Sequence, residues 1–386
     1  MPPTQILLSA GEASGDMYAA SLASELKKRA DVAIFGMGGA QMRAAGVATT
    51  TDYSEVAVLG ITEILKHLPQ LRRAMRNLVG EALSRKPALA ILTDFPGFHL
   101  RLARKLKPLG VRNVYYICPQ FWAWRPWRAN LVRRRFALAL CIFPFEEKFF
   151  ADAEVPVKFI GHPLVGQVRA AISRQEFAGK HGLRESYKTI AILPGSRPGE
   201  IKRHLPTLVE SCGELERQHP GQYNFVLALA AETNLGEVRT MMRPLPSLTI
   251  VQGDTYSALA SADAAIICSG TATVEAALLD VPMVVVYKVS KLTALLAKPL
   301  IRTKFFGMVN LIAEKEVAPE LIQEKFTPHN VAREVRNLLE PSRAVQAHTE
   351  LAEVRRRLGP PGAVERAAEA ILSLLHGAGQ ASGNAS

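Results

Sequence analysis

Residues 188–197 read KTIAILPGSR, an apolar run that ends in a proline and a glycine just before a stretch with helical spacing. Such a run predicts a buried strand of a parallel sheet, followed by a turn that leads into a helix. The same succession opens the chain, where Thr4–Ser9 is predicted to be a strand, Gly11–Asp16 a turn and Met17–Arg29 a helix. This order indicates an α/β fold with helices on both faces of each sheet.

The alternation of strands and helices runs through the chain and restarts once. Further apolar runs predict strands at 32–36, 88–93, 114–117, 138–142 and 158–160, and then at 225–230, 248–251, 264–268 and 283–287. Between the two sets the pattern breaks near residues 161–170. We therefore predict two doubly wound, Rossmann-like domains, with ligands bound at the carboxyl ends of their strands. Two such halves would face each other across a cleft.

The composition and the charge indicate which kind of partner and which compartment to expect. The 386 residues are 48% hydrophobic and carry a net charge of +12, and residues 1–165 hold 22 Lys and Arg against 13 Asp and Glu. An anionic partner is expected: phosphate, acidic lipid or nucleic acid. Four scattered cysteines and the lack of any Asp-x-Asp argue for a reducing compartment and metal-independent chemistry. No secretory signal or membrane span is recognised, so we expect a soluble or surface-bound protein.

Two strand ends in the first half carry candidate functional residues. The turn after the first strand contains Gly11, Ser14, Gly15 and Asp16, which could let a ligand approach the backbone. A plain turn capped by Ser14 or Asp16 explains the pattern better. Asp94 ends the third predicted strand, where a carboxylate could accept a proton from a hydroxyl or cap the next helix.

All three tryptophans lie between Pro119 and Arg128, beside arginines. Aromatic rings such as Trp122 and Trp124 next to arginine suit sugar stacking, lipid headgroups or single-stranded nucleic acid. The alternative is a hydrophobic lid beside a solvated basic helix.

A basic amphipathic pattern spans residues 59–79. Its apolar residues recur at steps of three or four, with cations among them, so the segment could lie on an anionic membrane surface. An ordinary helix packed on the sheet fits the composition better, and Pro69 should interrupt it. The residues that would face a membrane are Ile61, Ile64, Leu65, Leu68, Arg72, Arg73 and Arg76.

Two turns in the second half predict a site for a nucleotide. They contain Gly195, Ser196 and Arg197, and Ser269, Gly270, Thr271, Thr273 and Glu275. Arg197 could stabilise the negative charge that develops on a leaving phosphate. The alternative is that Arg197 is an exposed residue of an ordinary turn. Glu275 could accept hydrogen bonds from ribose hydroxyls or belong to a capping box. Asn310, in a later apolar segment, could orient a ligand or be a buried, satisfied amide.

The chain resembles the lipid-A-disaccharide synthase family over roughly residues 5–375. The resemblance rests on the order of the Gly11 turn, the Asp94 strand end, the Pro119–Trp124 block, Gly161-His162-Pro163, the Pro194–Arg197 turn, the Ser269–Glu275 turn and the Asn310 segment. It implies a GT-B fold, with residues 1–165 and a last helix at about 350–376 in the first domain. Residues 166–349 would bind the donor, and the Gly-, Ala- and Ser-rich tail 377–386 should be disordered.

The resemblance also implies an activity. Such an enzyme joins UDP-2,3-diacylglucosamine to 2,3-diacylglucosamine 1-phosphate, with inversion, and releases a β-1′,6-linked disaccharide and UDP. The resemblance implies that the enzyme needs no cofactor. It also implies that the enzyme lies peripherally on the cytoplasmic face of a Gram-negative inner membrane. Asp94 would be the base, Arg197 and the turn at Thr271 would stabilise the diphosphate, and Asn310 would take part. Where other members often have Pro-Asp-Phe, this chain has Asp-Phe-Pro-Gly-Phe, which puts more weight on Asp94.

Other interpretations of the sequence stay open. A UDP-sugar 2-epimerase shares the two-domain architecture but would have no use for a basic amphipathic helix and a tryptophan block. A non-catalytic binder of UDP-sugars on a membrane surface is a second alternative. Nucleic-acid binding is suggested by the charge alone, and the chain has no recognised module for it, so nucleic acid is not a predicted partner. A homodimer is left open.

Overall fold

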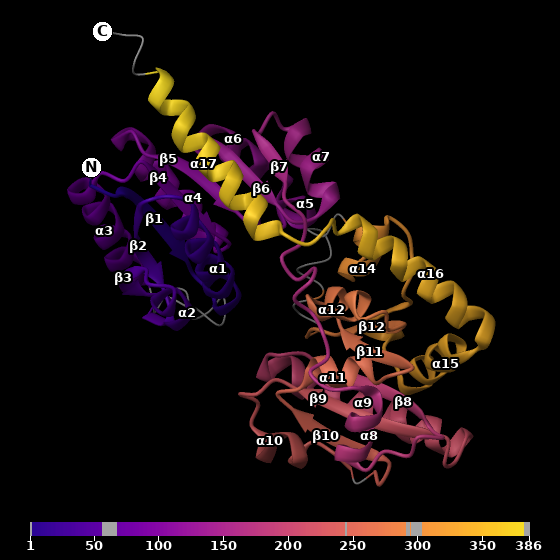
Figure 1. Cartoon of the computed structure of the whole chain (residues 1–386). Helices are drawn as coiled ribbons and strands as arrows, with labels where there is room; N and C mark the ends of the chain where they lie inside the picture. The colour runs from indigo at the N-terminus through magenta and orange to yellow at the C-terminus, as the bar shows by residue number, and fades with distance from the viewer. Residues whose placement is uncertain (1, 56–67, 244, 291–293, 295–302, 382–386) are drawn as a thin grey trace. The chain divides into compact units, whose positions relative to one another are not determined.

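The computed structural model describes residues 2–55, 68–243, 245–290, 294 and 303–381. The chain divides into an N-terminal unit, Met1–Pro163 with Pro360–Ser386, and a C-terminal unit, Leu164–Gly359 (Figure 1). Each unit is built around one sheet, and all the described strand pairs are parallel. The predicted α/β fold class with two doubly wound sheets is confirmed.

The sheet of the N-terminal unit has the strand order β3-β2-β1-β4-β5-β6-β7. Its strands are β1 Thr4–Ala10, β2 Val32–Gly38, β3 Ala48–Asp52, β4 Leu89–Thr93, β5 Arg112–Tyr116, β6 Leu138–Cys141 and β7 Val157–Phe159. Its helices are α1 Ala13–Arg29, α2 Ala40–Ala44, α3 Leu68–Arg85, α4 Pro96–Leu106, α5 Phe121–Trp124, α6 Ala129–Arg135, α7 Pro144–Asp152 and α17 Ala363–Ala381, with short 3₁₀ turns η1 Tyr53–Glu55, η2 Lys107–Leu109 and η3 Pro126–Arg128. The order reverses between β1 and β4, which makes their carboxyl ends the switch point of this sheet.

The central strands of this sheet are β1 and β4. All five side chains of β4 are buried, as are the last five of β1, as expected for strands covered on both faces. Their register pairs Ala10 with Thr93, so Gly11 and Asp94 leave neighbouring strands at the same edge. The edge strand β3 was not predicted, because its Thr-rich sequence is partly exposed and shows no apolar run.

The sheet of the C-terminal unit has the order β10-β9-β8-β11-β12-β13 and its switch point between β8 and β11. Its strands are β8 Lys188–Leu193, β9 Tyr223–Leu229, β10 Leu248–Gln252, β11 Ala264–Cys268, β12 Met283–Tyr287 and β13 Glu320–Ile322. Its helices are α8 Arg174–His181, α9 Pro198–Gln218, α10 Leu235–Thr240, α11 Thr255–Ala260, α12 Ala272–Leu278, α14 Met308–Ala313, α15 Pro328–Leu339 and α16 Pro341–Arg357, with the 3₁₀ turn η4 Gln323–Lys325. The strand β13 was not predicted, because Glu320–Ile322 contains a charged residue, lies among further charged residues and forms no apolar run.

The last helix, α17, belongs to the N-terminal unit, where it packs against α1 (Figure 1). Arg112 of β5 donates a hydrogen bond to the carbonyl oxygen of Leu374 at 2.6 Å. The helix predicted at about 350–376 is two helices in the structure, and the units divide between Gly359 and Pro360. Gly359 has a φ of +85°, a backbone conformation that ends α16, and Pro360 with the next proline prevents the helix from continuing.

The tail prediction is corrected in part. Residues 377–381 are the last residues of α17 and are helical, whereas 382–386 lie outside the described residues. A helix already held by packing can extend by one more turn, here through two alanines and a glutamine, despite Gly377 and Gly379, which are poor helix formers.

Candidate functional site

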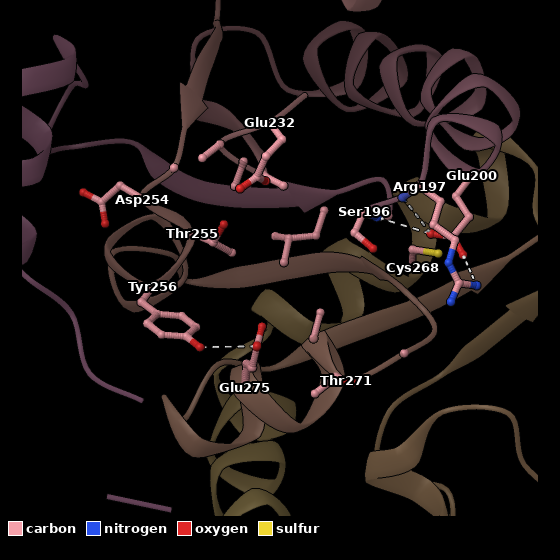
Figure 2. Close-up of a pocket in the computed structure, with 18 of the residues that line it drawn as sticks. Ser196, Arg197, Glu200, Glu232, Asp254, Thr255, Tyr256, Cys268, Thr271 and Glu275 are labelled. Atoms are coloured by element: carbon pink, nitrogen blue, oxygen red, sulfur yellow. Dashed lines mark hydrogen bonds and ion pairs between the residues drawn. The ribbon is translucent and has the colours of Figure 1, made fainter. Parts of the chain in front are cut away.

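A pocket of about 800 Å³ opens at the carboxyl ends of β8, β9, β11 and β12, within the C-terminal unit (Figure 2). The predicted residues that line it are Gly195, Ser196, Arg197, Ser269, Gly270, Thr271 and Glu275. The two turns lie together because both follow strands that meet at the switch point of the sheet. A pocket of this size at such a place is suited to a small molecule such as a nucleotide.

One side of the pocket is formed by the turn before α9. The Glu200 carboxylate accepts hydrogen bonds from the backbone N–H groups of Ser196 and Arg197, at 3.2 and 3.3 Å (Figure 2). A side chain at Gly195, which has a φ of +114°, would meet Glu200 at 2.7 Å. The amides that we predicted to hold phosphate therefore already hold a carboxylate. Arg197 lies 3.8 Å from the Glu200 carboxylate in a long ion pair, but its side chain is 73% exposed, so an anion in the pocket can reach it.

The opposite side of the pocket, in the view of Figure 2, holds Tyr256 and Glu275. The Tyr256 hydroxyl donates a hydrogen bond of 3.3 Å to Glu275 Oε1. Burial raises the pKa of Tyr256 to about 12, so the phenol stays a donor, and burial also raises the pKa of Glu275 against the effect of this hydrogen bond. Sequence analysis missed Tyr256, because nothing in its spacing links it to Glu275 on the next helix.

Thr273 does not belong to this site. Its side chain is buried, donates a hydrogen bond to the carbonyl oxygen of Gly270 at 2.9 Å and does not line the pocket. The prediction that Thr273 binds the donor is therefore corrected. Its side chain points into the first turn of α12, which it stabilises.

Asn310, predicted to be catalytic, has no hydrogen-bonding capacity left for a ligand. Its amide nitrogen donates to the carbonyl oxygen of Ala318 and to Glu320, and its oxygen accepts from the N–H groups of Val317 and Ala318, all at 2.7–2.9 Å. An amide has two donors and two acceptor positions, and all are used. The structure thus corrects the catalytic assignment: Asn310 is a fully buried amide that fixes the 317–320 loop.

The switch point of the N-terminal unit is built differently. Asp94 and Phe95 follow β4 with φ angles of +54° and +44°, in the left-handed region that non-glycine residues rarely occupy. Burial, and next the negative charge of Glu12, raise the pKa of Asp94 to about 6, against a hydrogen bond from the Phe95 N–H. Asp94 is therefore a carboxylate that can bind and release a proton near neutral pH, as a general base must.

The unusual backbone of Asp94 is supported by buried groups. His99 Nδ1 lies 2.8 Å from the Asp94 carbonyl oxygen, and His99 Nε2 lies 2.8 Å from the Ser9 hydroxyl. Burial lowers the pKa of His99 to about 4, so the ring is neutral: Nδ1–H donates to the carbonyl, and Ser9 donates to Nε2. Tyr115 donates a second hydrogen bond to the same carbonyl, at 3.2 Å. None of these three residues lies in a recognisable motif.

The glycine turn after β1 is closed to a ligand at two positions. A side chain at Gly11 would meet the Phe95 ring at 2.3 Å, so this ring already covers the turn. The Asp16 carboxylate is buried and accepts hydrogen bonds from the N–H groups of Gly39 and Gln41, at 2.6 and 3.0 Å. Asp16 therefore holds the next turn of the fold, and its predicted role in ligand binding is corrected. Ser14 is exposed and Gly15 is buried in α1.

A hydrogen bond from Trp122 to a buried carboxylate holds the tryptophan block in place. Trp122 donates its Nε1–H to the buried Glu146 at 3.1 Å, and burial raises the pKa of Glu146 to about 7. Trp122 is thus partly buried and acts as an anchor for the block. Trp124 is exposed and remains a candidate for contact with a ligand.

The predicted membrane-facing segment is only partly described. Ile61, Ile64 and Leu65 lie outside the described residues. Pro69 lies in the first described turn of α3, where its missing N–H breaks no described helical bond, and its predicted interruption of a helix that begins before residue 68 stays a prediction. Leu68 is partly buried, whereas Arg72, Arg73 and Arg76 are exposed.

The apolar side of α3 faces the protein. Ala74 and Leu78 are buried in the core of the unit, and Leu71 and Met75 pack against it. This half of the segment is an ordinary packed helix with a charged outer surface. In the described ranges, no helix combines the length and the apolar character that crossing a membrane requires. The same ranges contain no His, Cys, Asp and Glu cluster arranged to hold a metal ion.

Solved structures with the same architecture define the class of this protein. The UDP-GlcNAc 2-epimerase from Neisseria meningitidis, solved bound to UDP-GlcNAc, matches with a TM-score of 0.64 over 96% of this chain and 100% of its own, at 13% identity. The calicheamicin glycosyltransferase CalG4 matches with a TM-score of 0.62 over 97% of this chain and 99% of its own, at 15% identity. The chain therefore has the GT-B fold.

Sequence comparison identifies the family within that class. The family model of lipid-A-disaccharide synthetase matches residues 6–372. The lipid-A-disaccharide synthase of Solibacter usitatus (strain Ellin6076) is 44% identical over 376 residues, 97% of this chain and 98% of that protein. That of Myxococcus xanthus (strain DK1622) is 42% identical over the same length and coverage. The chain belongs to the lipid-A-disaccharide synthase family and is a glycosyltransferase, which confirms the predicted resemblance; the alternative activities are not favoured.

Proposed function

We propose that this chain transfers the sugar of UDP-2,3-diacylglucosamine to the 6-hydroxyl of 2,3-diacylglucosamine 1-phosphate, with inversion. The products are the β-1′,6-linked disaccharide 1-phosphate and UDP. Family membership supports this reaction. The observation that carries it in the structure is the pocket between the Ser196 and Ser269 turns, with the Glu275 carboxylate on one side and the largely exposed Arg197 guanidinium on the other.

In this proposal the C-terminal unit binds the UDP-sugar. Glu275 accepts hydrogen bonds from the ribose hydroxyls, because its carboxylate lines the pocket and is held in place by Tyr256. Arg197 lies on the other side and neutralises charge that builds on the departing diphosphate. The phosphate displaces or passes beside Glu200, so binding of the donor should rearrange the first turn of α9.

The N-terminal unit supplies the base. Asp94 takes the proton of the acceptor hydroxyl, supported by its pKa of about 6 and by the rigid backbone that holds it. Carboxylates positioned in this way contribute about 10²–10⁴-fold to rates. The enzyme would work peripherally on the cytoplasmic face of a Gram-negative inner membrane. This location is supported by the lipid nature of the substrates and by the exposed Arg72, Arg73 and Arg76.

The test is a product assay with both acylated substrates, read by mass spectrometry, with the anomeric configuration of the new bond read by NMR. A β-linked disaccharide 1-phosphate together with an equal amount of UDP is expected. Incubation with UDP-GlcNAc alone tests the epimerase alternative. An α linkage would contradict inversion, and UDP-ManNAc without any disaccharide would contradict the proposed reaction.

A further inference from the structure

Two arginines of the tryptophan block lie against aromatic rings on the N-terminal unit. The guanidinium carbon of Arg125 lies 4.4 Å from the ring centroid of Trp124. That of Arg128 lies 5.5–5.7 Å from the rings of Phe121, Trp124 and Trp127. Trp124 and Trp127 are 39% and 58% exposed, so the cluster opens to solvent on its ring side. Aromatic faces orient a guanidinium and reduce its contact with water.

These two guanidiniums have no acidic partner among the described residues. Across the described ranges, the guanidinium group of neither Arg125 nor Arg128 forms an ion pair or a hydrogen bond, and Arg128 Nε is buried without a hydrogen-bond partner. Neighbouring arginines on α6 are satisfied: Arg133 pairs with Glu154, and Arg135 donates to the carbonyl oxygen of Leu100. A buried donor without a partner is rare in folded proteins and calls for a specific explanation.

Charge repulsion inside the cluster is also uncompensated. Burial lowers the pKa of Arg128, and the positive charges of Arg125 and Arg101 lower it further. Two like charges that lie close together and are partly removed from water destabilise the protein unless an anion binds to them. The cluster therefore has more positive charge than its protein neighbours balance.

The cluster lies at the same sheet edge as Asp94. The cluster follows the carboxyl end of β5, which pairs in parallel with β4, the strand that Asp94 follows, and the Tyr115 hydroxyl of β5 donates to the Asp94 carbonyl oxygen. An anion held by Arg128 would thus sit near the candidate base, within one unit of the protein.

We propose that Arg125 and Arg128 form a binding site for a phosphate monoester, walled by the Trp124 and Trp127 rings. Guanidinium groups bind phosphate oxygens in pairs of parallel hydrogen bonds. A phosphate monoester carries close to two negative charges at neutral pH, so it balances the charges of both arginines. A phosphodiester carries one negative charge, so one positive charge of the cluster would remain unbalanced. The source of the phosphate, the 1-phosphate of the sugar acceptor, rests on the proposed function; the site itself does not.

All three tryptophans of the chain lie in this block, so intrinsic tryptophan fluorescence reports on the site directly. The purified full chain is titrated with glucosamine 1-phosphate, with glucosamine, and with vesicles of phosphatidylglycerol. We expect a saturable change with glucosamine 1-phosphate only. Arg128→Gln should weaken this binding by tenfold or more, and Arg125→Gln should weaken it too. Arg134→Gln, which removes an exposed charge from α6, is the matched control and should bind as the wild type does.

Three results would overturn the site: equal responses to glucosamine and its phosphate, unchanged binding in both Arg128→Gln and Arg125→Gln, or a response to vesicles alone, which would make the cluster a membrane contact. If Arg128→Gln does not fold, the binding measured for Arg125→Gln tests the site instead. A kinetic arm compares diacylglucosamine with and without its 1-phosphate; Arg128→Gln should raise the KM of the phosphorylated acceptor only. If the wild type binds glucosamine 1-phosphate through Arg128 yet makes no disaccharide, the proposed function fails and the site stands.

Discussion

Both units of this protein place a glycine turn at the switch point of a parallel sheet, but the two turns have opposite surroundings. In the N-terminal unit the Phe95 ring covers Gly11, and the neighbouring Asp94 is held in a strained backbone by His99. In the C-terminal unit the space beside Gly195 opens into a pocket of about 800 Å³. Topology thus fixes where a ligand site lies, and the side chains around each turn decide whether it binds a molecule or positions a reactive group.

The difference predicts that changes in the two units affect different kinetic constants. Groups at the filled turn of the N-terminal unit should act on kcat and its pH dependence. Groups around the open pocket of the C-terminal unit should act on affinity for the UDP-sugar. The following variants test this division, from the largest expected effect to the smallest.

Asp94→Asn should lower kcat by about 10²–10⁴-fold, because the amide cannot accept the proton of the acceptor hydroxyl. Binding of UDP, measured by calorimetry, should stay unchanged, since the pocket lies in the other unit. Asp31→Asn, which neutralises an exposed carboxylate of the same unit, is the control. A kcat within threefold of the wild type, as an order-of-magnitude limit, would remove Asp94 from the role of base.

His99→Leu should lower kcat by roughly tenfold and the free energy of unfolding by about 1–3 kcal/mol, because Ser9 and the Asp94 carbonyl lose a buried partner. His99→Asn places a donor near the position of Nδ1 and should restore kcat more than it restores stability. Denaturant unfolding and steady-state kinetics, at a temperature where both variants are folded, measure the two effects. Equal kcat values for the Leu and Asn variants would show that His99 only stabilises the fold.

Tyr256→Phe should raise the KM of the UDP-sugar by about 2–10-fold and leave kcat unchanged, because one hydrogen bond to Glu275 is lost. Tyr187→Phe is the matched control, since Tyr187 lies in the same unit and does not line the pocket. A fall in kcat at constant KM would contradict the division between the units.

Glu12→Gln should have the smallest effect, a shift of the pH profile. In the wild type, kcat/KM should rise with pH through about 6, as Asp94 loses its proton and becomes a competent base. Without the negative charge of Glu12, ionisation of Asp94 is easier, so its pKa falls and the acid limb moves to lower pH. The shift should be partial, because burial is the larger cause. If the acid limb of the pH profile stays in place or moves to higher pH in Glu12→Gln, the charge of Glu12 does not raise the pKa of Asp94.

The sequence allowed most strands and the turns at their carboxyl ends to be predicted, because apolar strands followed by glycine turns have a fixed meaning in parallel sheets. KTIAILPGSR led directly to β8, its turn and α9, and the Ser269 turn was correctly placed beside it. Family membership followed from the order of these motifs. The strands β3 and β13 were missed, since a polar edge strand and a three-residue strand leave no apolar run.

What the sequence could not reveal were contacts between side chains far apart in the chain. Phe95 covering Gly11, Glu200 occupying the amides of its own turn, and Tyr256 holding Glu275 depend on rotamers and packing, which leave no periodic pattern. The same limit explains the corrections at Asp16 and Asn310. Polar residues in a motif can either bind a ligand or satisfy the backbone, and only the hydrogen-bond partners distinguish the two.

The return of α17 to the first unit has a consequence for how the protein is made. Ala367, Ala368 and Ile371 are fully buried, and the bond from Arg112 to Leu374 joins residues 262 positions apart. The C-terminal unit is in effect an insertion, so its whole sequence has left the ribosome before the N-terminal unit receives its final helix. Until residues 363–381 are synthesised, α1 lacks this packing partner, so the first unit stays partly assembled while the C-terminal unit is made.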